Sequence, residues 1–195
     1  MNKIVKRQLV KGEDAHGYYP IDPCVICDVL DGFTINSACD RIMDFGAGKG
    51  SGLLALEACG FTKLAGIEYT EQLYYCMRDN FELLGWNCIK SQDEFSLDDS
   101  LQILTILGDA GGLEFELDSF NWFYFFNPFG TLVFEKVIDN ICRSLYRRKR
   151  KVRIVYGEPM CHKIVINSGM FKQVKESRID FYNGVMWFRV YESEN

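Results

Sequence analysis

The stretch that decides the fold is Asp44-Phe45-Gly46-Ala47-Gly48-Lys49-Gly50-Ser51-Gly52. Its glycines stand at alternate positions, directly after the short apolar run of residues 41–45. Glycine has no Cβ, so it allows the backbone to turn sharply and to lie close to a ligand. The stretch therefore predicts a tight turn from a buried strand into a helix, whose free N–H groups and positive dipole end can bind a ligand.

The spacing of these glycines separates two classes of ligand-binding turn. The dinucleotide fingerprint G-x-G-x-x-G needs a glycine at its sixth position. That position is Ser51 when counted from Gly46, and Leu53 when counted from Gly48. The pattern present is D-x-G-x-G-x-G, which does not meet the dinucleotide spacing. A nucleotide-dependent oxidoreductase of the NAD(P) type stays open as an alternative.

Around this turn, short apolar runs alternate with helical patterns. Two β-rich segments follow, and Tyr182-Asn183-Gly184 between them is a hairpin signal. Alternating strands and helices form a mostly parallel sheet with helices on both faces, and the hairpin adds one antiparallel strand. The sequence therefore predicts one α/β domain over residues 1–195 with a seven-stranded sheet. The strands are expected at 41–45, 63–69, 101–107, 119–126, 152–157, 171–179 and 184–192, and the main helices at 22–31, 53–60, 71–84 and 131–147.

Features at the ends of four successive strands resemble one family. Asp44-x-Gly46-x-Gly48-x-Gly50 looks like the first motif of class I, Rossmann-like S-adenosylmethionine (SAM)-dependent methyltransferases. Glu68 ends the second strand, Gly108-Asp109-Ala110 ends the third, and Asn127-Pro128-Phe129 ends the fourth. The resemblance covers roughly residues 18–160, and it implies SAM as the cofactor and a methyl transfer as the reaction.

The resemblance also implies roles for individual residues. Glu68 would bind the ribose hydroxyls, as the acid after a nucleotide-binding turn does. Asp109 would lie beside the adenine, although it could instead only cap the next helix. Tyr18 would lie near the methionine end of the cofactor. The complete set expected to bind the cofactor is Tyr18, Asp44, Gly46, Ala47, Gly48, Gly50, Glu68, Tyr69, Asp109, Ala110 and Asn127.

The acceptor side of the site is predicted from the end of the fourth strand and from the N-terminal arm, residues 1–20. Asn127-Pro128-Phe129 resembles the (Asn/Asp)-Pro-Pro-aromatic signature of enzymes that methylate exocyclic or amide nitrogens. The second proline is missing and Gly130 follows, which leaves the acceptor atom open. Asn127, Phe129 and Tyr19 are the expected catalytic residues, with the arm folding over the cofactor or the substrate. Alternatively, Asn127-Pro128 only turns the chain.

The charge balance bears on the class of substrate. The chain has 22 Lys and Arg against 27 Asp and Glu, a formal net charge of −5. An acidic domain binds a nucleic acid backbone poorly, so a small molecule, a glycan or a protein side chain is favoured as acceptor. The basic run 147–151 ends a predicted helix, where cations complement the helix dipole, and is interpreted as a solvated helix end.

The eight cysteines point to no metal site. Cys24-x-x-Cys27 lacks a second such pair or a histidine pair, so no metal is expected. Scattered cysteines without an export signal or an 18-residue apolar run favour a reduced, cytoplasmic protein. A non-catalytic scaffold that keeps the same fold is a further alternative to the methyltransferase.

Overall fold

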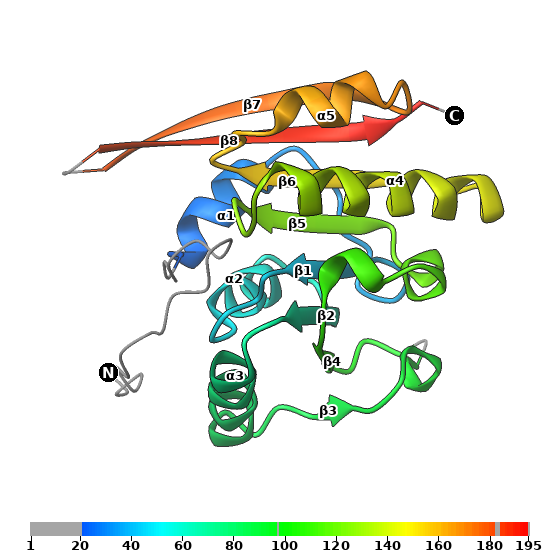
Figure 1. The fold of residues 1–195 in the computed structure, drawn as a ribbon. Helices are drawn as coiled ribbons and strands as arrows, with labels where there is room; N and C mark the ends of the chain where they lie inside the picture. Colours follow the sequence, from blue (N-terminus) through cyan, green and yellow to red (C-terminus); the bar gives the residue numbers. More distant parts are fainter. Residues whose placement is uncertain (1–20, 97, 182–183, 195) are drawn as a thin grey trace.

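The computed structural model describes residues 21–96, 98–181 and 184–194 and contains one eight-stranded sheet. The strands are β1 (Arg41–Phe45), β2 (Lys63–Glu68), β3 (Cys88–Ile89), β4 (Gln102–Leu107), β5 (Trp122–Phe126), β6 (Arg153–Gly157), β7 (Phe171–Phe181) and β8 (Gly184–Ser193). Their order across the sheet is β3-β4-β2-β1-β5-β6-β8-β7 (Figure 1). Every neighbouring pair is parallel except β6–β8 and β7–β8, so β8 is the reversed strand.

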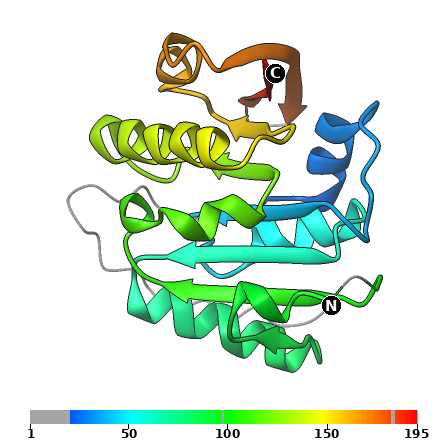
Figure 2. The ribbon, with the colours of Figure 1, turned by 90° about the vertical axis from the view of Figure 1, so that its right-hand side faces the viewer.

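Helices cover both faces of the sheet. The α-helices are α1 (Pro23–Leu30), α2 (Ser51–Ala58), α3 (Glu71–Leu83), α4 (Thr131–Arg147) and α5 (His162–Asn167), and the 3-10 helices are η1 (Gln92–Glu94), η2 (Ala110–Gly112) and η3 (Phe115–Ser119). One core cluster joins α1, α2 and α3 to the first face, and a second joins η2, η3, α4 and α5 to the other. Figure 2 shows α1 and α4 on opposite sides of the sheet.

The predicted α/β class, the parallel sheet and the single reversed strand are confirmed. The predicted number of seven strands is wrong, because Cys88–Ile89 adds an eighth strand beside β4. Two residues are too few to show the alternation of apolar and polar side chains that indicates a strand. The domain's centre is strand β5, whose residues Trp122–Phe125 are all buried because helices cover both of its faces.

The hairpin formed by β7 and β8 is longer than the neighbouring strand β6. Pairing between β6 and β8 ends at Gly157 and Phe188, whereas β7 and β8 stay paired as far as Phe181 and Gly184. Since β8 runs against its neighbours, the extra length projects past the carboxyl edge of the sheet (Figure 1). The turn predicted at 182–183 lies outside the described residues. Trp187 lies in an apolar strand pattern, which predicts a core position, but it is 42% exposed on this projection.

Two further findings concern the environment of the chain. All eight cysteines are free thiols. Within residues 21–96, 98–181 and 184–194, no helix is long and apolar enough to cross a membrane.

Candidate functional site

The glycine turn between β1 and α2 has the conformation that its sequence predicts. Gly46, Gly48 and Gly50 have φ angles of 79°, 56° and 89°, in the left-handed region. A Cβ at Gly46 would lie 2.5 Å from the Cβ of Pro128, and a Cβ at Gly50 would lie 2.6 Å from a ring carbon of Phe81. Only glycine fits both the backbone angles and the space at these two positions.

Glu68, at the end of β2, closes the site beside this turn. Its carboxylate is almost completely buried and accepts hydrogen bonds from the N–H groups of Gly48 (2.9 Å) and Thr70 (2.7 Å). A carboxylate can accept about four hydrogen bonds, so capacity remains for the hydroxyl groups of a ligand. From α3, the Asn80 amide donates to the Lys49 carbonyl at 3.0 Å and fixes the other side of the turn. Sequence reasoning missed Thr70 and Asn80, because their roles depend on backbone contacts.

Asp44 lies beneath the turn. Its carboxyl group is buried beside Gly52, where an added Cβ would collide with it, and the ring of Tyr124 lies against the same place. Burial, with a smaller effect from the negative charge of Glu68, raises the pKa of Asp44 to about 8. Asp44 therefore holds a proton at neutral pH. Because it lies beneath the turn, it supports the turn from the core side.

The residues that follow β2 and β4 form the next side of the candidate site. Tyr69, after β2, is 77% exposed, and Ala110, after β4, is buried. Asp109 accepts a hydrogen bond from the Gly111 N–H at 2.9 Å and is the N-cap of η2, so the capping role left open by the sequence is present.

The end of β5 lies directly against the glycine turn, because Pro128 is the residue that would contact a side chain at Gly46. Asn127 has a φ of 39°, rare for a residue other than glycine, and its N–H donates to the Gly157 carbonyl at 3.1 Å. The ring of Phe129 packs edge-on against Phe125, 6.3 Å away, so it is part of the core as well as of the rim. Tyr18 and Tyr19 lie outside the described residues.

These residues meet at the carboxyl edge of the sheet. They follow β1, β2, β4 and β5, and the strand order reverses between β1 and β5. Open α/β sheets bind ligands in the crevice at such a switch point. The structure therefore brings Gly46, Gly48, Glu68, Asp109 and Asn127 to the place where a cofactor is expected.

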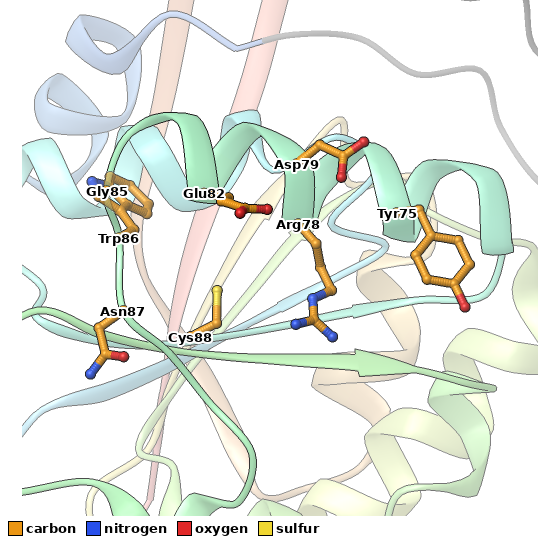
Figure 3. Close-up of a pocket in the computed structure, with 8 residues that line it drawn as sticks. All are labelled: Tyr75, Arg78, Asp79, Glu82, Gly85, Trp86, Asn87 and Cys88. Carbon is orange, nitrogen blue, oxygen red and sulfur yellow. The ribbon is translucent and has the colours of Figure 1, made fainter.

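A separate recess of about 690 Å³ lies away from this edge, between α3 and β3. Figure 3 shows its side chains along α3 and the segment that leads to β3. It contains none of the residues predicted for the cofactor or the acceptor. The lining residues are Tyr75, Arg78, Asp79, Glu82, Gly85, Trp86, Asn87 and Cys88.

In the part of the chain that the structure describes, no group of three or more His, Cys, Asp or Glu side chains could hold a metal ion. The Cys24-x-x-Cys27 pair lies on α1 and is not part of such a group.

Comparison with known proteins identifies the fold. No family model and no curated protein matches the chain. Magnesium protoporphyrin IX methyltransferase from Synechocystis PCC 6803, solved with bound SAM, is 14% identical with a TM-score of 0.57, covering 88% of this chain and 78% of that one. Precorrin-6y C5,15-methyltransferase from Geobacter metallireducens is 13% identical with a TM-score of 0.55, covering 89% and 86%.

A third match is a candidate tRNA (m1A22) methyltransferase from Streptococcus pneumoniae. It is 15% identical with a TM-score of 0.58, covering 85% of this chain and 68% of that one. The chain therefore has the fold of class I SAM-dependent methyltransferases.

Proposed function

We propose that this protein is a SAM-dependent methyltransferase. The observation that carries the proposal is the buried carboxylate of Glu68, hydrogen-bonded to Gly48 in a turn that a Cβ would fill. An acid at the end of the second strand, beside a glycine turn, is the arrangement that binds the ribose of a nucleotide.

The residues present fit this cofactor. The N-cap of helix α2 is Gly50, which has no side chain to bond the first N–H groups of the helix, so these would be available to a ligand. Glu68 would accept the ribose hydroxyls, Asp109 would lie beside the adenine, and Tyr69 and Ala110 would complete the cofactor site. When bound, SAM supplies a methyl group activated by its sulfonium. The protein's task is to hold the acceptor in line with that methyl group.

The acceptor would lie on the β5 side of the turn, where Asn127 and Phe129 are the proposed catalytic residues. Tyr19, in the arm of residues 1–20, is the third proposed catalytic residue, and the arm is proposed to cover the site. The net charge of −5 supports a small molecule, a glycan or a protein side chain over nucleic acid. The similar structures include enzymes named for both small-molecule and tRNA substrates.

Titration calorimetry with SAM and with S-adenosylhomocysteine (SAH) tests the proposal. Glu68→Gln removes the charge while keeping an acceptor oxygen, and we expect affinity to fall about ten-fold or more, the loss of one charge-assisted hydrogen bond. Glu82→Gln, at the far end of α3, is the matched control and should bind like the wild type. Wild-type protein that binds neither compound at millimolar concentration would contradict the proposal, and NADH binding in their place would favour the oxidoreductase.

A further inference from the structure

Strand β6 ends in the same way as its neighbour β5. Each is followed by a polar residue and a proline, Asn127-Pro128 after β5 and Glu158-Pro159 after β6. Asn127 has a φ of 39° and Glu158 has a φ of 48°; among the described residues, they are the ones other than glycine in the left-handed region. Such a conformation costs about 1–3 kcal/mol, and residues that adopt it occur preferentially at functional sites. Two strained corners therefore stand side by side at the carboxyl edge.

The strain at Glu158 places its carboxylate in the plane of the sheet. The Glu158 N–H donates to the Trp187 carbonyl at 2.8 Å, which continues the β6–β8 pairing by one step. The Trp187 N–H then donates to Oε1 of the Glu158 side chain at 2.9 Å. The carboxylate thus takes the position that a main-chain carbonyl would otherwise have. It is fixed at the edge of the sheet by the backbone of β8.

The second carboxylate oxygen is available. Among the described residues, no donor bonds to Oε2 of Glu158, and no ion pair involves it. The Glu158 corner lies beside the Asn127 corner, whose N–H bonds to the Gly157 carbonyl, and the carboxylate is bonded to the backbone of the part-exposed Trp187 on the projecting hairpin. A half-buried carboxylate attracts a group that carries N–H or positive charge, and it repels an anion.

We propose that Glu158 determines the specificity for the acceptor, and that the acceptor presents a nitrogen carrying N–H, as an amine or an amino-substituted ring does. This inference rests on the proposed function. From the carboxyl edge of the sheet, one strand beyond Asn127, the carboxylate would receive the N–H of the acceptor. Methylation of that nitrogen forms the N–C bond from its lone pair, returns the S–C electron pair to sulfur and releases one proton to solvent.

Two cofactor analogues test this without knowledge of the acceptor. Sinefungin carries a protonated amine where SAM has its methyl group, and SAH has no group there. We expect the wild type to bind sinefungin more tightly than SAH. Glu158→Gln keeps the oxygen that accepts from Trp187 and loses the charge, so sinefungin affinity should fall about five-fold while SAH affinity stays unchanged. Glu82→Gln is the control for charge and should change neither value.

The outcomes separate this inference from the proposed function. Wild-type protein that binds SAH without preferring sinefungin overturns the inference, and so does a preference that survives in Glu158→Gln. Absence of SAH binding contradicts the proposed function instead. A second measurement uses SAM with a tritiated methyl group. The enzyme is offered one pool of primary amines and amino-purines and a separate pool of alcohols and carboxylates, and the label transferred to each pool is counted. Label found only in the second pool, or in neither, overturns the inference.

Discussion

Gly46 and Gly32 have nearly the same backbone but different surroundings. Their φ angles are 79° and 86°. Nothing lies within 4 Å of a Cβ added at Gly32, whereas one at Gly46 would lie 2.5 Å from Pro128. Gly32→Ala should therefore cost only about 1 kcal/mol of unfolding free energy for the left-handed backbone. Gly46→Ala should cost about 3 kcal/mol, because overpacking is added.

Urea unfolding of the two variants measures this difference. Calorimetry should also show that SAH binding is lost in Gly46→Ala and kept in Gly32→Ala. Equal stability of the two variants would show that Pro128 yields easily, and that the turn and the β5 corner are not tightly coupled.

Single residues also show which parts of the site can be predicted. Glu68 could be identified because an acid at a strand end near a glycine turn is a local pattern. Glu158 follows a strand in the same way, and the repeated polar-proline pair was a signal that could have found it. The role proposed for it was not predictable, because the carboxylate is held by Trp187 of β8, a contact that depends on how β6 and β8 align.

At the scale of elements, the charged side chains of the basic run 147–151 connect the end of α4 to neighbouring elements. Arg147 forms an ion pair with Asp118 at 2.7 Å, and Lys151 forms one with Glu192 at 2.9 Å. Arg150 donates to the carbonyls of Phe120 (2.6 Å) and Leu117 (2.8 Å), so it joins the end of α4 to η3. The run follows the end of α4 as predicted, and Arg147, Arg150 and Lys151 also join this end to neighbouring elements.

Arg150→Ala should lower the unfolding free energy by about 2–3 kcal/mol, because buried carbonyls lose a charged donor. Lys149→Ala, next to it and exposed, should change the free energy by less than about 0.5 kcal/mol. Urea titrations followed by circular dichroism measure both values. Similar losses in the two variants would mean that Arg150 acts only as a surface charge.

Elements with a strong internal pattern were predicted best. Helix α4 has the bounds 131–147 expected from its apolar spacing. The strand expected at 119–126 begins only at Trp122, because Phe115–Ser119 folds as η3. The continuous apolar run covers only 122–126, and the mixed residues Ser119-Phe120-Asn121 before it do not show where a helix ends and a strand begins.

At the scale of the whole molecule, Asp44 links stability to pH. The pKa of Asp44 is raised to about 8 in the folded state, whereas an unfolded aspartate has a pKa near 3.9. Between these values the folded protein holds a proton that the unfolded chain has lost. The contribution of Asp44 to stability is therefore complete below about pH 4 and is lost as the pH rises toward 8.

Asp44→Asn removes this dependence. We expect the stability of the wild type, relative to the variant, to fall by about 1 kcal/mol for each pH unit between pH 5 and pH 7. Urea unfolding at pH 5, 6, 7 and 8 measures the two curves. If the unfolding free energies of the wild type and the variant changed with pH in parallel, Asp44 would be ionised in the folded protein.

The position of β8 between β6 and β7 has a consequence for synthesis on the ribosome. When β6 has been made, its outer edge has no partner, because the strand that pairs with it ends only at Ser193. At a translation rate of about 5–20 residues per second, that edge waits a few seconds for its neighbour. A nascent chain that carries an open, apolar strand edge can pair with other chains, so the β6 edge is exposed to such pairing during this interval.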